Sequence, residues 1–273
     1  MTHAPAGRPP PSDTRYCPAP HAPGIVVRRH ALTTMQTPAV MTAPLAIYIA
    51  TLDDALRAPD VLSADEHARL QAMGSARRRR QFSAGRRLLR HALSHHSAAT
   101  PADAWPLVLH DARPVLATDD GLCFSLSHSG DHLACIIGRD TPCGIDVQAR
   151  RDGTAAIARE FFDAHANTWL RRQPDPDHAF HQLWVLKEAW AKATGTPLLT
   201  ALKDSTWAVG HAASHEAGAW AAGTATLPGA LTLGWTASDA PQAPPLWAWR
   251  DGRFVATELA WTRWRPAGPA CTA

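Results

Sequence analysis

The spacing of apolar positions along the chain changes several times, and each period predicts one kind of element. Short apolar runs and apolar residues that alternate with polar ones predict strands, which cover residues 45–50, 105–110, 124–127, 132–138, 144–148, 207–209, 231–235 and 261–264. Apolar residues three and four positions apart predict helices, which cover residues 63–73, 76–95, 154–172 and 180–195. Regular structure is therefore expected between residues 45 and 265.

Local signals mark where several of these elements begin, end or turn. Ser63 and Glu66 have the spacing of a capping box at the start of a helix. Gly195 is typical of the end of a helix. Residues 129–131 predict a turn between two strands of a hairpin, and an Asp-Gly pair within residues 247–255 predicts a second hairpin.

The N-terminal 43 residues differ from the rest of the chain. Residues 1–43 are rich in Pro, Ala, Thr and His and follow neither a helical nor a strand period, which predicts a disordered extension. They lack the charged and apolar regions of a signal peptide. Met35 and Met41 precede the first predicted strand, and we expect translation to start at one of them.

Composition limits the class of protein. The five cysteines show no CxxC spacing, which predicts free thiols in a reducing compartment and a cytoplasmic protein. No apolar run has the length needed to cross a bilayer. Outside residues 1–43 the basic and acidic residues balance, so any anion-binding region must be a local patch.

The predicted helix over residues 180–195 has two different faces. Leu183, Leu186, Trp190 and Ala193 recur at helical spacing and are expected to form its buried stripe. Pro174 and Pro176 are expected to break the chain before this helix.

A neighbouring face of this helix carries polar chemistry. Trp184, Glu188 and Lys192 lie four residues apart, with Lys187 beside the carboxylate. An ordinary solvent-exposed Glu–Lys pair is the simplest interpretation. However, the chain has only three lysines, and the third is Lys203. Two lysines in a chain that otherwise uses Arg suggest that a compact ammonium matters at this helix.

The helix over residues 76–95 is dense in positive charge. It contains seven arginines: Arg77, Arg78, Arg79, Arg80, Arg86, Arg87 and Arg90. Such a cluster can be a solvated face, a nucleic-acid contact or a pocket for one multiply charged phosphate. No aromatic stacking set or recognition motif accompanies it, which favours the phosphate over nucleic acid.

Two strand motifs add further polar groups. In Phe-Ser-Leu-Ser-His-Ser-Gly, residues 124–130, Ser127 and His128 close a half-buried strand. A lone histidine is more often structural than a ligand. In Gly-Ile-Asp-Val-Gln, Asp146 and Gln148 share one face of a strand, where their oxygens could bind Mg²⁺ or simply face solvent.

Together these elements resemble the 4′-phosphopantetheinyl transferases of the Sfp type. The similarity rests on residues 124–129, 144–147 and 184–192, which match the strand motif with Ser-His-Ser, the Gly-Ile-Asp-Val motif and the Trp-x-x-Lys-Glu-Ala-x-x-Lys motif. The turn at residues 112–114 looks like the Gly-Lys/Arg-Pro element of the family. The resemblance extends over roughly residues 45–265, with little detail after residue 210.

The resemblance implies an α+β fold of two pseudo-symmetric lobes with the active site in the cleft between them. It divides the chain into an N-terminal lobe at 44–143, a C-terminal lobe at 144–265 and a tail at 266–273. It implies a monomeric, Mg²⁺-dependent enzyme that transfers the 4′-phosphopantetheine group of coenzyme A to a serine of an apo acyl or peptidyl carrier protein. The other product is adenosine 3′,5′-bisphosphate, and neither nucleic acid nor membrane is a partner.

The resemblance also assigns roles to residues. Asp146 and Glu188 would hold Mg²⁺, and Gln148 stands where many members carry a third acid. Glu188 would also accept the proton of the serine, and Lys192 would take part in catalysis. Lys187 and Lys192 would contact the pyrophosphate. The 3′-phosphate and adenosine end would meet the following side chains: Arg78, Arg86, Arg113, Ser127 and His128.

Two alternatives predict different behaviour. A non-enzymatic relative, suggested by Gln148, would bind coenzyme A without modifying any carrier. A nucleic-acid-binding module built on residues 77–80 would bind in a salt-sensitive way. For the carrier protein, the apolar strip at Trp169 and Leu170 is a predicted docking surface.

Overall fold

The computed structural model describes residues 43–110, 113–118, 120–203, 207–209, 220–240 and 242–266. The predicted disordered extension lies outside the described residues except for Ala43, and so does the predicted tail except for Pro266. Nothing in the described part of the chain forms a helix long and apolar enough to span a membrane.

The helices confirm most of the predicted ones. In chain order they are α1 Leu52–Arg57, α2 Ala64–Ala72, α3 Ala76–Ser97, the short 3₁₀ turn η1 Ala102–Ala104, α4 Ala155–Phe161, α5 Ala164–Leu170, α6 Pro176–Thr194 and α7 Leu198–Lys203. The capping box of Ser63 and Glu66 is formed at the start of α2. Gly195 ends α6 with φ +71°, as its position predicted.

The strands form two five-stranded sheets and a hairpin. The first sheet has the order β11-β10-β1-β5-β4, with β1 Leu45–Thr51, β4 Leu122–Ser129, β5 His132–Arg139, β10 Leu246–Arg250 and β11 Arg253–Thr257. The second has the order β6-β9-β8-β12-β7, with β6 Cys143–Ala149, β7 Trp207–Val209, β8 Trp220–Leu227, β9 Leu231–Ser238 and β12 Thr262–Pro266. The hairpin joins β2 Leu107–His110 and β3 Arg113–Leu116.

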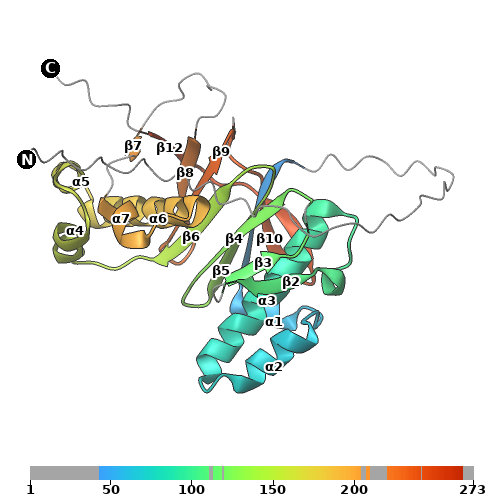
Figure 1. The fold of residues 1–273 in the computed structure, drawn as a ribbon. Coiled ribbons are helices and arrows are strands. Elements are labelled where there is room, and N and C mark those ends of the chain that lie inside the picture. The colour runs from blue at the N-terminus through green and yellow to red at the C-terminus, as the bar shows by residue number, and fades with distance from the viewer. Residues whose placement is uncertain are drawn as a thin grey trace, which may run out of the picture. The chain divides into compact units, whose positions relative to one another are not determined.

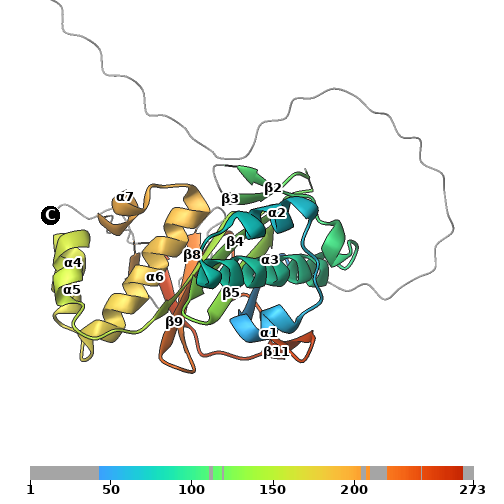
Figure 2. The ribbon, with the colours of Figure 1, turned by 90° about the horizontal axis from the view of Figure 1, so that it is seen from below.

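Helices and sheets share three cores. Residues of β1 alternate between two of them: Tyr48 packs with α3, while Ile47 packs with residues of β6 and β9. A third core lies between α4, α5, α6 and the second sheet. Figure 1 shows α6 along β6 and β9, and in Figure 2 α3 and α6 both lie in front of the sheets. The fold is α+β, as expected.

Several local predictions need correction. The stretch 154–172 forms two helices instead of one, because Asp163 caps a new helix start. Pro174 lies in the predicted break between α5 and α6, whereas Pro176 is the first residue of α6, with Asp175 as its cap. Arg113, predicted in a turn, begins strand β3.

Sheet membership also crosses the predicted lobe boundary. Strands β10 and β11 are followed in the described chain only by β12. Even so, β10 pairs in parallel with β1 at the centre of the first sheet. Residues 246–257 therefore belong with the N-terminal strands. The sheets do not divide the chain at a single point near residue 143.

A buried histidine makes stability depend on pH. His96 is 4% exposed and lies 3.3 Å from the hydroxyl of Tyr48. Burial, Arg139 and His95 lower the pKa of His96 to about 4. An unfolded histidine titrates near pH 6.5. The contribution of neutral, buried His96 to the free energy of unfolding is therefore present above pH 6.5 and is lost as the pH falls toward 4. Between pH 7 and pH 5 it should lower the free energy of unfolding by about 2 kcal/mol.

Urea unfolding of His96→Gln at pH 7 and pH 5 tests this expectation. From pH 7 to pH 5, the free energy of unfolding of the variant should fall by about 2 kcal/mol less than that of the wild type. His165→Gln, which changes an exposed histidine on α5, is the control and should behave as the wild type. Equal losses in His96→Gln and wild type would show that His96 is not responsible.

Candidate active site

Serine side chains join the edge strands of the two sheets. Strand β4 ends the first sheet and β6 ends the second. The hydroxyl oxygens of Ser125, Ser127 and Ser129 accept hydrogen bonds from the backbone N–H groups twenty residues later, on Ile145, Val147 and Ala149. We call this row of bonds the serine ladder. It replaces a backbone ladder and fixes β6 against β4.

The serine ladder positions the carboxylate of Asp146. Asp146 is only 3% exposed, and its Oδ1 accepts a hydrogen bond of 2.5 Å from the hydroxyl of Ser127 and one of 2.7 Å from the ammonium of Lys192. Its buried Oδ2 has no hydrogen-bond partner among the described residues. A buried carboxylate oxygen without a partner is costly, so the site is prepared for a cation or a donor.

Helix α6 brings the second carboxylate to the same place. Glu188 accepts a hydrogen bond of 2.8 Å from the indole N–H of Trp184, and its Oε2 lies 4.0 Å from the ammonium of Lys192. Burial and the negative charge of Asp146 raise the pKa of Glu188, and Lys192 offsets this only in part. Two carboxylates that share one ammonium form an acidic pocket that favours an added cation.

Two glycines explain how α6 comes so close to the sheet. A Cβ on Gly144 would lie 1.9 Å from the carbonyl oxygen of Ala189, and one on Gly234 would lie 2.5 Å from a methyl group of Val185. Both glycines therefore allow close backbone approach. Lys192 strengthens the contact with a 3.0 Å hydrogen bond to the carbonyl of Ile145.

His128 lies at the exposed end of this cluster. Partial burial and the ammonium of Lys192 lower the pKa of His128, while Asp146 opposes the shift. The guanidinium of Arg77 also lowers it, which puts the N-terminus of α3 within electrostatic reach of the site. Sequence reasoning had not singled out Arg77 within its cluster, because helical spacing alone does not reveal which arginine faces β4.

Comparisons with known proteins agree with this geometry. A sequence profile of the 4′-phosphopantetheinyl transferase superfamily matches residues 142–234, which contain β6 and α6. The 4′-phosphopantetheinyl transferase HetI of Nostoc sp. is 33% identical over 141 residues, which are 49% of this chain and 60% of the relative. A 4′-phosphopantetheinyl transferase of Bacillus subtilis is 30% identical over 151 residues, which are 50% of this chain and 67% of the relative.

The chain belongs to the 4′-phosphopantetheinyl transferase superfamily. A third relative, the 4′-phosphopantetheinyl transferase psf-1 of Bacillus pumilus, is 34% identical over 114 residues, 41% of this chain and 48% of the relative. The chain thus matches between about half and two thirds of the length of these relatives.

The arginines of this superfamily member have separate roles. Arg86, predicted to bind the 3′-phosphate, is 7% exposed and lies 3.2 Å from a carboxylate oxygen of Glu66, and its contact with coenzyme A stays a prediction. Arg90 pairs with the same carboxylate at 2.9 Å. These two ion pairs join α3 to α2. Arg78 is exposed near the start of α3 and Arg113 at the start of β3, and their contacts with coenzyme A stay predictions.

Lys187 is 2% exposed, and its ammonium lies 3.4 Å from the carbonyl of Ala201 and 5.5 Å from the ring centroid of Phe162. The predicted contact of Lys187 with the pyrophosphate stays a prediction. Gln148 is half-buried on the same face of β6 as Asp146. The described residues contain no group of three His, Cys, Asp or Glu side chains that could hold a metal.

The predicted carrier-docking strip is wrong in one of its two residues. Leu170 is 5% exposed and belongs to the core beneath α6. Trp169 is half-buried, with its ring 5.7 Å from that of Trp264. Alanine at Leu170 would create a cavity instead of testing a surface.

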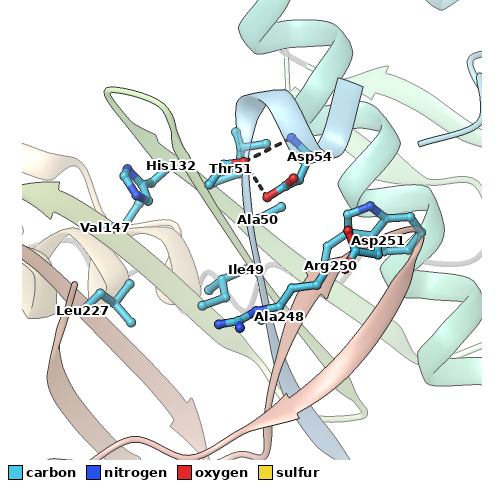
Figure 3. Close-up of a pocket in the computed structure, with 12 residues that line it drawn as sticks. Ile49, Ala50, Thr51, Asp54, His132, Val147, Leu227, Ala248, Arg250 and Asp251 are labelled. Carbon is cyan, nitrogen blue, oxygen red and sulfur yellow. Dashed lines mark hydrogen bonds between the residues drawn. The ribbon is translucent and has the colours of Figure 1, made fainter. Parts of the chain in front are cut away.

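A cavity of 410 Å³ lies on the face of β6 that carries Val147 (Figure 3). Val147 lines it, and successive strand residues point to opposite faces, so Asp146 points away from it. Thr51 and Asp54, joined by hydrogen bonds, form part of its polar side. The described residues that line this cavity include none of the predicted site residues. The candidate active site is therefore on the Asp146 face.

Proposed function

We propose that this protein transfers the 4′-phosphopantetheine group of coenzyme A to a serine hydroxyl of an apo acyl or peptidyl carrier protein. The serine oxygen attacks the phosphorus that carries the pantetheine arm, and the bond from that phosphorus to the bridging pyrophosphate oxygen breaks. Adenosine 3′,5′-bisphosphate leaves with the bonding electrons. Membership in the superfamily supports the reaction, and the cluster of Asp146, Glu188 and Lys192 supports its location.

The carboxylates fit the Mg²⁺ that the family implies. The unpartnered Oδ2 of Asp146 and the raised pKa of Glu188 both indicate that the pocket has an excess of negative charge. Mg²⁺ commonly binds one or two carboxylates together with waters and substrate phosphates. Asp146 and Glu188 would hold the ion, with the amide oxygen of Gln148 as a further ligand. When bound, Mg²⁺ would neutralise the negative charge that develops on the departing phosphate as the pyrophosphate bond breaks.

The remaining side chains have roles that follow from their positions. Lys192 would turn from Asp146 toward the pyrophosphate oxygens when a cation takes its place, since its side chain is 30% exposed and its ammonium makes one hydrogen bond to Asp146 and one to the carbonyl of Ile145. Glu188 would accept the proton of the carrier serine, directly or through water. His128 and Arg77 would face the phosphorylated nucleoside end.

We also infer that the two sheets form the cores of two lobes that meet at the serine ladder. In this arrangement the first lobe contains residues 246–257 in addition to the N-terminal strands. The pairing of β10 with β1 and the bonds between β4 and β6 support it. That the protein acts as a monomer stays a prediction.

An apo-carrier mass assay tests the proposed function. Purified protein, coenzyme A, Mg²⁺ and a panel of apo acyl and peptidyl carrier proteins should give carriers heavier by one phosphopantetheine group. Calorimetry with coenzyme A accompanies the assay. Binding of coenzyme A without modification of any carrier would support the non-enzymatic alternative instead.

The position of Ser127 leads to a test of its role. Sequence reasoning assigned it to the 3′-phosphate, whereas its hydroxyl bonds to Asp146 and the N–H of Val147. Ser127→Ala should therefore lower kcat about tenfold or more and raise the Mg²⁺ concentration needed for half-maximal rate. The KM for coenzyme A should change little. A raised KM for coenzyme A that disappears with the 3′-dephospho analogue would favour the direct contact instead.

A further inference from the structure

The serine ladder continues into a pair of cysteines. Ser125, Ser127 and Ser129 each meet the residue twenty positions later, and the next pair in this register is Cys123 with Cys143. Their sulfur atoms are 4.0 Å apart. The pair thus joins β4 to β6, and with them the edges of the two sheets.

The surroundings leave room for both sulfur atoms. Each lies 3.3 Å from the position that a Cβ on Gly138 would occupy, so the two sulfur atoms pack against this glycine. Cys143 is 5% exposed, whereas Cys123 is half-buried and can meet a small solute. Cys135, on the neighbouring strand β5, is fully buried with its pKa raised by burial.

We propose that Cys123 and Cys143 form an oxidation site at which a hydroperoxide converts the two thiols into a disulfide across the β4–β6 contact. The Cys123 thiolate attacks the terminal peroxide oxygen, the O–O bond breaks, and the alcohol or water leaves. The resulting sulfenic acid is attacked by the sulfur of Cys143. The S–O bond then breaks, and hydroxide leaves as water with the proton of Cys143. Two thiols are oxidised and one peroxide is reduced.

The environment of the pair supports this order of events. The S–H of Cys143 can donate to the sulfur of Cys123, which stabilises a thiolate there and lowers the pKa of Cys123. Burial and the neighbouring Cys123 raise the pKa of Cys143. When protonated, the Cys123 thiol can also donate to the carbonyl oxygens of Thr141 at 2.8 Å and Gly138 at 3.4 Å. Because Cys123 is the more exposed of the two, a peroxide reaches its sulfur first, and the buried Cys143 resolves the sulfenic acid.

The disulfide would act on the catalytic groups through β6. A disulfide requires a distance of about 2.0 Å between sulfur atoms, so the pair must close from 4.0 Å. Closure draws the start of β6 toward β4, three residues before Asp146. On the proposed function, the oxidised protein should therefore transfer more slowly, because small displacements of catalytic groups carry large kinetic costs.

Hydrogen peroxide treatment of the full chain tests the thiol chemistry independently of transferase activity. The background is Cys17→Ser together with Cys271→Ser, since these positions lie outside the described residues. Oxidation should remove the mass of two hydrogens, and peptide mapping should link Cys123 to Cys143 while Cys135 keeps its thiol. Stable sulfinic acid on Cys123, or a link to Cys135, would overturn the proposal.

Two variants serve as matched controls. Cys123→Ser introduces serine, the residue type found at the other three positions of the serine ladder. This variant should therefore fold, and Cys143 should resist oxidation in it. Cys143→Ser should accumulate sulfenic acid at Cys123, trapped by dimedone. If either variant loses the same mass at the same rate as the background protein, the pair is not the site.

Carrier modification before and after oxidation tests the consequence. The oxidised protein should be about tenfold slower or more, and dithiothreitol should restore the rate. Oxidised Cys123→Ser should keep its rate. Full disulfide formation with an unchanged rate would overturn the effect on transfer, while absence of transfer in the reduced protein would count against the proposed function alone.

Discussion

Glu188→Gln is expected to lower the rate of carrier modification by about 10³-fold while the protein stays folded. The amide keeps the size of the side chain and can still accept the hydrogen bond from Trp184. It removes the charge that would hold Mg²⁺ and accept the proton of the serine. The loss should appear in kcat more than in the KM for coenzyme A, because the charge is needed most as the pyrophosphate bond breaks.

Glu188→Gln should not lower the stability of the protein, although it lowers the rate. Glu188 lies near the negative charge of Asp146, and burial already disfavours its ionised form. Removing that charge should leave the midpoint of thermal unfolding unchanged or raise it slightly. Glu160→Gln, on the exposed face of α4, is the matched control and should keep full activity. A Glu188→Gln enzyme with more than a tenth of the wild-type rate would contradict the assigned role.

Asp146→Asn is expected to lower the rate by about 10²-fold or more and to raise the Mg²⁺ concentration for half-maximal rate. The asparagine oxygen can still accept from Ser127. However, the side chain loses its charge, and its amide nitrogen can occupy the position of the unpartnered Oδ2. A metal titration of the transfer rate measures both effects.

This substitution should also destabilise the protein, unlike Glu188→Gln. Lys192 loses the ion pair that its ammonium makes at 2.7 Å, so the free energy of unfolding should fall by about 1–2 kcal/mol. Asp152→Asn, in the exposed segment after β6, controls for a general change of charge. If both carboxamide variants changed stability in the same direction, the paired role of Asp146 would be wrong.

The local parts of this fold follow from local sequence. The apolar period over residues 180–195 predicted α6, and Gly195 predicted its end. The Ser63 capping box predicted α2, and the Asp-Gly pair predicted the turn between β10 and β11, where Asp251 and Gly252 have φ values of +48° and +81°. Each signal depends on residues within one turn or one hairpin of one another, so the neighbouring residues alone decide the outcome.

Burial is harder to predict than the helix itself. Leu183 and Leu186 are buried as expected, whereas Trp190 and Ala193 are only half-buried. Lys187 is buried although it is charged, because α7 and Phe162 cover that side of α6. Which face of a helix is covered depends on elements elsewhere in the chain.

The sequence by itself determined the elements, the motifs and the chemistry of the candidate site: Asp146 and Glu188 as carboxylates, Lys192 as the ammonium, and the family they belong to. The tertiary structure alone decided which of these groups meet. It joined Lys192 to Asp146, turned Ser127 toward that carboxylate and committed Arg86 to Glu66. The reason is physical: contacts between residues far apart in the chain depend on how strands pair and helices pack, and local period carries no information about these contacts.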